Sequence, residues 1–147
     1  MTDDTLTWHQ LGPIPDRVDE AWHGFDWNRW ESLLNARTIV IDRPRRSVHP
    51  AHPSIIYPID YGHLPDTRGG DGQEVDVWCG SSDSGLVGLI MTRDHVKKDR
   101  EVDLLWNCTA EEIYLVNGFI NFDRELLEGQ LLLRYPMTEQ WSRQISK

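Results

Sequence analysis

The stretch Tyr61–Gly80, YGHLPDTRGGDGQEVDVWCG, joins a glycine-rich acidic turn to a segment in which polar and apolar residues alternate. Every second residue of the segment 74–80 is apolar, and this period is typical of a β-strand with one buried face. The glycines before it permit sharp turns. Asp71 and Asp76 lie on either side of the point where the turn becomes the strand. The stretch therefore predicts a turn and a strand with acidic side chains at the strand end.

A second acidic turn follows the apolar segment 86–92 and carries Asp94 and Asp99. Magnesium prefers oxygen ligands, usually a few carboxylates completed by water and substrate phosphate. Four aspartates at two strand ends could supply such a site from one rim. Glycine and aspartate are also the ordinary residues of solvated turns. Spacing alone leaves both interpretations open, and the solvated turn is the simpler one.

The rest of the chain predicts short strands with helices around them. A helix is expected over residues 18–37, and a second over 110–122, where Thr109 and Glu112 form a capping-box pattern. Residues 43–66 contain five prolines, which exclude a helix and favour extended, turning backbone. This order predicts an α+β domain, a small closed or nearly closed barrel with helices outside. The expected strands are residues 38–42, 74–80, 86–92, 101–107 and 130–136.

Composition limits the class of protein. The chain has 147 residues, 39% of them hydrophobic, which is enough for one domain with one core. A formal net charge of −9 without a basic patch argues against nucleic-acid binding. No apolar run approaches the roughly 20 residues that span a bilayer, and the acidic N-terminus does not resemble a signal peptide, so we expect a cytoplasmic protein without membrane contact. Cys79 and Cys108 are expected to be reduced core thiols, with a bridge as the second interpretation.

Tryptophan is concentrated near the N-terminus, with four of the seven tryptophans in the first 30 residues. We expect residues 1–37 to form a Trp-rich helical extension that packs on a body formed by residues 38–147, the two making one structural domain. Such aromatic residues more often indicate a core or a homo-oligomer contact than a cofactor platform.

A longer pattern changes the interpretation of the acidic turns. Residues 55–80, IIYPIDYGHLPDTRGGDGQEVDVWCG, resemble the signature of the soluble family I inorganic pyrophosphatases, in which Y-P-x-x-Y-G-Y-I-P-x-T precedes D-G-D-x-x-D-V. Residues 85–105 resemble the family segment G-x-x-x-M-x-D-x-x-x-x-D, and residues 38–44 resemble its I-E-I-P strand with Asp42 in place of the glutamate. The residues matched in the first block are Tyr57, Pro58, Tyr61, Gly62, Pro65, Thr67, Asp71, Gly72, Asp76 and Val77.

The resemblance implies a fold and an activity. The fold would be the family's small OB-like five-stranded β-barrel with flanking helices. The activity would be Mg²⁺-dependent hydrolysis of pyrophosphate, a small-molecule phosphate substrate, by a metal-activated water, with Mn²⁺ as a possible substitute. By resemblance, the metal ligands would be Asp71, Asp76, Asp94 and Asp99. The catalytic residues would be Asp76, Tyr61 and Gln73, and the substrate phosphates would be bound by Arg43, Arg45, Arg46, Tyr61 and Lys98.

The chain departs from the family pattern at several of these positions. Gln73 replaces a carboxylate that orients or deprotonates the attacking water, and an amide cannot accept that proton. Glu101 replaces a family lysine, and the loop before Tyr57 is too short for the family's lysine-bearing hairpin. Two alternatives therefore stay open. One is a protein of the pyrophosphatase fold that binds metal and a phosphorylated ligand without efficient turnover, and the other is an interaction protein.

Overall fold

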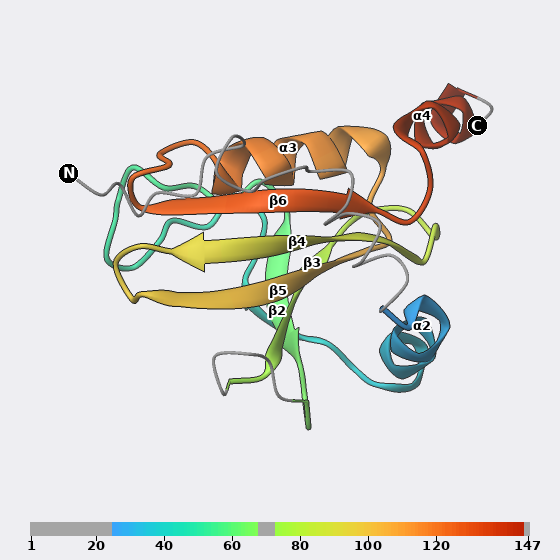
Figure 1. Ribbon diagram of the computed structural model, residues 1–147, viewed down its shortest axis with the longest axis horizontal. Coiled ribbons are helices and arrows are strands. Elements are labelled where there is room, and N and C mark those ends of the chain that lie inside the picture. The colour runs from blue at the N-terminus through green and yellow to red at the C-terminus, as the bar shows by residue number, and fades with distance from the viewer. Residues whose placement is uncertain (1–24, 68–72, 146–147) are drawn as a thin grey trace.

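The computed structural model describes residues 25–67 and 73–145, and its centre is one six-stranded sheet with the strand order β1-β2-β3-β5-β4-β6 (Figure 1). Neighbouring strands are antiparallel except β3 and β5, which run parallel. The strands are β1 (Val40–Arg43), β2 (Asp60–Leu64), β3 (Val75–Cys79), β4 (Leu86–Asp94), β5 (Asp99–Trp106) and β6 (Leu127–Leu133). The helices are α2 (Trp27–Ala36), α3 (Ala110–Ile120) and α4 (Met137–Ile145).

The α+β class is confirmed, whereas a closed five-stranded barrel is not found. Six strands form the sheet, and within the described residues β1 and β6 each pair with one neighbour only, so the sheet is open. The additional strand, β2, lies inside the segment where prolines led us to expect turns. Pro58 and Pro65 flank the strand without entering it, so β2 keeps every main-chain N–H that its ladders need.

Helix α3 covers one face of the sheet and runs beside β6 (Figure 1). Its predicted capping box is present: the Glu112 main-chain N–H donates to Thr109 Oγ1 at 3.1 Å, and the Thr109 N–H donates to Glu112 Oε1 at 2.9 Å. Three apolar residues of its inner stripe, Ile113, Val116 and Ile120, are buried. They pack on side chains from β3, β4 and β5, and we call this side of the sheet the α3 face.

Helix α2 packs on the opposite side, which we call the α2 face. Leu34 is buried there, and Trp27 and Trp30 pack against the same apolar cluster, as their helical spacing predicted. Glu31 fixes the helix to the body, because it accepts the Leu86 N–H at 3.0 Å and pairs with Arg134 at 2.8 Å. The first part of the predicted helix, residues 18–24, lies outside the described residues, as do the other two N-terminal tryptophans.

Helix α4 was not predicted, although it is amphipathic and buries Gln140. The strand expected over 130–136 begins earlier, at Leu127, and ends at Leu133, which leaves room for this helix. In the part of the chain that the structure describes, no helix is both long enough and apolar enough to cross a bilayer.

Both cysteines carry free thiols, as expected. Cys108 is fully buried, and burial raises the pKa of its thiol well above the ordinary value. Burial also raises the pKa of the Cys79 thiol. Thiols held in the protonated form are poor nucleophiles, so these two side chains serve the core.

Candidate active site

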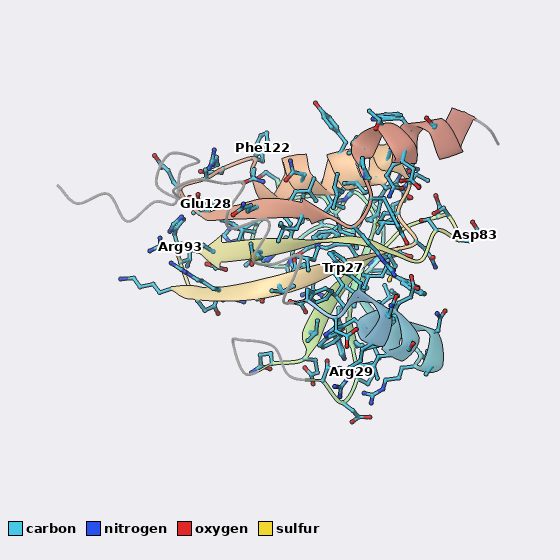
Figure 2. All side chains as sticks on the ribbon, turned by 45° about the vertical axis from the view of Figure 1, so that its right-hand side comes forward. Trp27, Arg29, Asp83, Arg93, Phe122 and Glu128 are labelled. Carbon is cyan, nitrogen blue, oxygen red and sulfur yellow. The ribbon has the colours of Figure 1, made fainter. Side chains whose placement is uncertain are left out.

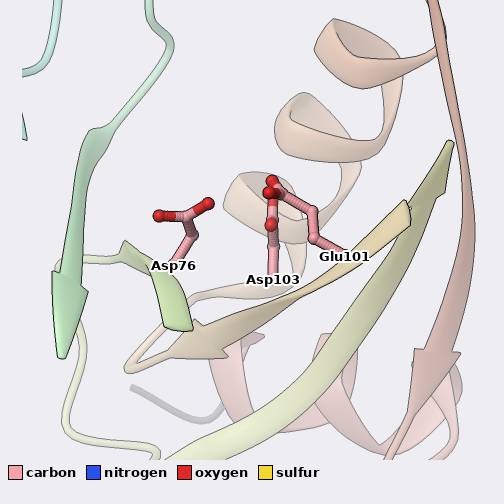
Figure 3. Close-up of side chains that lie close together, drawn as sticks. All are labelled: Asp76, Glu101 and Asp103. Atoms are coloured by element: carbon pink, nitrogen blue, oxygen red, sulfur yellow. The ribbon is translucent and has the colours of Figure 1, made fainter. Parts of the chain in front are cut away.

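Three carboxylates from two neighbouring strands converge on the α3 face (Figure 3). Asp76 on β3 lies directly beside Asp103 on β5 in the parallel pairing. Glu101 precedes Asp103 by two residues, so its side chain leaves the sheet on the same side. One carboxylate oxygen from each residue lies within 4.8 Å of the others. We call these three residues the carboxylate cluster.

The carboxylate cluster is shielded from water, which makes its charges costly. Asp103 is 3% exposed, and the side chains of Asp76 and Glu101 are partly buried. The Trp78 indole Nε1–H donates to Asp103 Oδ2 at 3.0 Å and fixes that carboxylate. Burial, followed by the charges of Asp103 and Asp76, raises the pKa of Glu101 well above its ordinary range. A divalent cation would relieve this repulsion, and oxygen ligands are the donors that Mg²⁺ or Mn²⁺ prefers, so the residues present fit a metal site.

Tyr61 on β2 lies next to the carboxylate cluster, near Asp76. Burial, followed by the negative charges of Asp103, Asp76 and Glu101, holds the pKa of its phenol far above the ordinary value. Its ring packs against Trp78 with 4.5 Å between centroids. Tyr61 therefore stays protonated and offers an O–H donor. Its contact with substrate remains a prediction.

The second predicted pair of metal ligands lies further along the same face. Asp94 and Asp99 are paired across β4 and β5 next to the hairpin that joins these strands. Asp99 precedes Glu101 by two residues, so both side chains leave the strand on the same face. Two residues of strand correspond to roughly 7 Å, so this pair forms a rim beside the carboxylate cluster. Asp94 Oδ1 also accepts the main-chain N–H groups of Val96 and Lys97, each at 2.9 Å, and thereby shapes the hairpin. Metal binding by Asp94 and Asp99 stays a prediction.

Of the two predicted site residues in the glycine-rich turn, Asp71 and Gln73, only Gln73 is among the described residues. Asp71 lies outside the described residues, so its predicted role as a metal ligand is not tested. Gln73 is exposed and precedes the first residue of β3 by two positions. Its predicted role beside the attacking water also stays a prediction.

Two residues of the carboxylate cluster were missed by sequence reasoning. Glu101 was interpreted as the replacement of a family lysine, and Asp103 was not considered. A usable signal was present, since Asp99, Glu101 and Asp103 alternate along one strand and must share a face. The neighbour relation between Asp103 and Asp76 was not accessible in this way, because it depends on the parallel pairing of β3 with β5.

The predicted substrate-binding cations come from the end of β1, the proline-rich loop (residues 44–59) and the β4–β5 hairpin. Arg43 is opposite Tyr61 in the antiparallel pairing, so its side chain starts on the same face as the carboxylate cluster. The Arg45 main-chain N–H donates to Asp60 Oδ1 at 2.8 Å. Arg46 and Lys98 adopt positive φ angles of 70° and 58°, typical of tight turns. Contacts of these four side chains with substrate stay predictions.

Asp42, which replaces the family glutamate, pairs with His63 rather than joining the carboxylate cluster. His63 Nδ1 lies 2.7 Å from Asp42 Oδ2. The hydrogen bond to Asp42 is the largest cause that raises the pKa of His63 above 6.5, and burial opposes it. A bulge between Ile41 and Arg43 gives Asp42 its place outside the regular β1–β2 register.

The α2 face carries a cavity that does not coincide with the carboxylate cluster. It lies between α2 and the turn after β2 and has a volume of about 460 Å³. Its polar groups already hold the fold: Asp26 caps α2 by accepting the Arg29 N–H, and Arg37 donates to the main-chain oxygens of Pro65 and Asp66. We therefore base the candidate site on the carboxylates.

Fold and site together define an α+β protein whose mixed sheet carries a carboxylate cluster suited to divalent cations. No protein-family model matches the chain. The chain is 28% identical over 136 residues to an inorganic pyrophosphatase of Picrophilus torridus, a match that covers 84% of this chain and 72% of the relative. A solved structure of an inorganic phosphatase from Anaplasma phagocytophilum aligns with a TM-score of 0.45 and 16% identity, over 65% of this chain and 81% of that one, a likeness too weak to add to the sequence relationship. The sequence relationship confirms the resemblance, and the chain is a homologue of inorganic pyrophosphatases.

Proposed function

We propose that this protein hydrolyses inorganic pyrophosphate, or a related phosphoanhydride, to phosphate with the help of divalent metal ions. Mg²⁺ is the expected cofactor, and Mn²⁺ is the expected substitute. The observation that carries the proposal is the position of Asp76. It is matched by the pyrophosphatase-like motif, and the structure independently brings it together with Glu101 and Asp103.

The carboxylate cluster would hold the metal, with the rim residues Asp94 and Asp99 and the turn residue Asp71 as further ligands. When bound, divalent ions neutralise phosphate charge and lower the pKa of a coordinated water. Asp76, Glu101 and Asp103 are well suited to this role because their oxygens are already close together and partly removed from water.

The other residues would bind and orient the substrate. Tyr61 would donate its O–H to a phosphoryl oxygen, since its phenol is held protonated beside the cluster. Arg43, Arg45, Arg46 and Lys98 would offset the negative charge of the phosphates. Gln73 would orient the attacking water through its amide, which can donate and accept hydrogen bonds but cannot take up the proton.

A phosphate-release assay tests the proposal. Purified protein is incubated with pyrophosphate and Mg²⁺, with EDTA as one control and Asp76→Asn as another. We expect metal-dependent release that Asp76→Asn abolishes. Asp83→Asn is the matched control, because it removes an exposed carboxylate at the opposite end of the sheet (Figure 2). Release that persists in Asp76→Asn, or that is absent from the wild type, would contradict the proposal.

Gln73 favours one alternative, a protein that binds metal and a phosphorylated ligand without efficient turnover. Gln73→Asp separates the two, because it restores a carboxylate at the family position. A higher rate in the variant indicates that the wild type lacks a base there. An unchanged or lower rate indicates that the site is built around another water position.

A further inference from the structure

The proline-rich loop, residues 44–59, lies beside the β4–β5 hairpin at one end of the sheet (Figure 1). His49 occupies a well-fixed position in this loop. Its main-chain N–H donates to Ile55 O at 2.9 Å, and the Tyr57 N–H donates to Ser47 O at 3.0 Å. A β-bridge between Val48 and Ile56 closes the loop around it.

The His49 ring continues a row of aromatic rings that ends at the carboxylate cluster. The rings of His49 and Tyr57 are within 10° of parallel, with centroids 6.3 Å apart. Tyr57 is followed by Tyr61, with centroids 5.7 Å apart and 26° between the ring planes. Tyr61 is the phenol that lies beside Asp76 and Asp103. His49 is thus held at the outer end of a row whose inner end is the candidate active site.

The loop also determines which nitrogen of His49 carries the proton. The Ala51 main-chain N–H donates to His49 Nδ1 at 3.0 Å, so Nδ1 must present its lone pair. The neutral ring then carries its proton on Nε2. Among the residues that the structure describes, none hydrogen-bonds to this Nε2. The loop therefore presents an N–H donor of fixed orientation that the described protein does not use.

Basic side chains act electrostatically on the His49 ring. Burial is the largest cause that lowers its pKa, followed by the charges of His52, Arg43 and Lys97. Arg43 starts on the face of the carboxylate cluster, opposite Tyr61. Lys97 is exposed on the β4–β5 hairpin, and its ammonium forms no ion pair with any described residue. A positive field next to clustered carboxylates suits an anion that metal ions bridge to those carboxylates.

We propose that His49 is a substrate-binding residue that donates its Nε2–H to a phosphoryl oxygen, with Arg43 and Lys97 supplying the positive charge around that group. This inference rests on the proposed function and deepens it. The proline-rich loop contributes a neutral, directional hydrogen-bond donor, and the β4–β5 hairpin contributes the positive charge of Lys97. The ring supplies orientation without charge, and the two cations supply the Coulomb attraction.

Binding of methylenediphosphonate in the presence of Mn²⁺ tests the proposal, because its P–C–P linkage is not hydrolysed. Dissociation constants are measured by calorimetry at pH 7.5. His49→Phe keeps a planar ring without the donor, and we expect its Kd to rise about tenfold, the size of a lost hydrogen bond to a charged group. His49→Gln retains an N–H at the end of the side chain, so we expect a smaller rise of roughly threefold. His52→Gln is the matched control and should stay within about twofold of the wild type.

Two-bond ¹H–¹⁵N spectra of the His49 ring give a second test, because the ring nitrogen signals would not respond to the ligand if His49 had only a structural role. We expect Nδ1 to be unprotonated with and without ligand. The Nε2 resonance should shift when methylenediphosphonate binds to the Mn²⁺-free protein loaded with diamagnetic Mg²⁺. A proton on Nδ1, or an unshifted Nε2 resonance in the bound state, would overturn the assignment.

The outcomes separate this inference from the proposed function. If the wild type releases phosphate but His49→Phe and His49→Gln both keep the wild-type Kd and KM, the role of His49 is wrong and the hydrolase remains. If the wild type releases no phosphate but binds methylenediphosphonate in a His49-dependent way, the hydrolase is wrong and the binding role stands. If the wild type does not bind methylenediphosphonate with Mn²⁺, the role of His49 is wrong. Should His49→Phe not fold, His49→Gln decides in the same way.

Discussion

The two faces of the sheet are formed by the same strands but differ in character. The α2 face is an ordinary apolar core, whereas the α3 face carries partly or fully buried carboxylates toward one end of its strands. On β5, Leu104 is 1% exposed and packs on the α2 face, while its neighbour Asp103 is 3% exposed and belongs to the carboxylate cluster. Burial alone therefore does not distinguish a core position from a candidate site. The distinction lies in what surrounds the buried group, since a buried carboxylate is tolerated only where partners or a cation offset its desolvation.

The α3 face itself is divided along its strands. Under α3 it is apolar, with Leu105 and Ile90 packed against Ile113. Toward the β4–β5 hairpin the same strand faces carry Asp103, Glu101 and then Asp99. The helix covers the part that is stabilised by excluding water, and the carboxylates occupy the part near the rim. The predictions below challenge this division, from the largest expected effect to the smallest.

Leu104→Ala should cause the largest loss of stability. The substitution leaves a cavity in the α2-face cluster, and such changes typically reduce the free energy of unfolding by about 2–5 kcal/mol. Urea unfolding measures this loss. Because Leu104 points away from the carboxylates, the Mn²⁺ dissociation constant of the folded variant should equal that of the wild type. A loss below about 1 kcal/mol would show that the α2 face is not the well-packed core we describe.

Glu101→Gln should have the opposite profile, with little loss of stability in EDTA and a lost response to metal. Because the pKa of Glu101 is raised in the folded state, folding at neutral pH must protonate or desolvate this carboxyl, and a neutral amide avoids that cost. The metal-free variant should therefore be at least as stable as the wild type. Wild-type protein should gain about 2.7 kcal/mol when free Mn²⁺ is a hundredfold above its Kd. Thermal unfolding with and without Mn²⁺ measures both effects. Glu111→Gln, which removes an exposed carboxylate on α3, is the control and should keep the full metal response.

The pH dependence of stability should change sign with metal. The pKa of Glu101 is raised in the folded state, so the folded protein binds a proton more tightly than the unfolded chain. In EDTA the free energy of unfolding should then increase as the pH falls from 8 toward 5. With Mn²⁺ it should decrease over the same range, because the ligands must be deprotonated to bind metal. Urea unfolding at several pH values measures this, and a wild-type slope in EDTA that equals that of Glu101→Gln would contradict the assigned cause.

Asp42→Asn should have the smallest effect, because the Asp42–His63 pair on β1 and β2 is partly exposed. Asp42 raises the pKa of His63 above 6.5, so the pair stabilises the fold below about pH 6.5 and loses this contribution as the pH rises through the folded-state value. The variant should be destabilised by less than about 1 kcal/mol at pH 5.5 and by less still at pH 8. An NMR titration of His63 checks the cause, since its pKa should fall in the variant.

Local patterns predicted the elements that form close to their own sequence. The capping box placed the start of α3 at Ala110, and helical spacing placed Trp27, Trp30 and Leu34 on one face. The motif around Asp76 singled out one member of the carboxylate cluster, whereas Glu101 and Asp103 were missed. Strand β2 was missed, since prolines at its borders outweighed its own five residues. The expected barrel is not confirmed for a different reason: the sheet is open, and closure depends on which edge strands pair.

The sequence by itself determined the acidic turn, the strand that carries Asp76, the capped helix α3 and the relationship to inorganic pyrophosphatases. Only the tertiary structure decided that Asp76 meets Glu101 and Asp103, because β3 and β5 pair in parallel across 25 or more residues of chain. Only the fold, likewise, brings the proline-rich loop with His49 beside the hairpin that carries Lys97. Spacing along the chain specifies which residues share a strand face, whereas contacts between strands depend on the burial of the whole sheet.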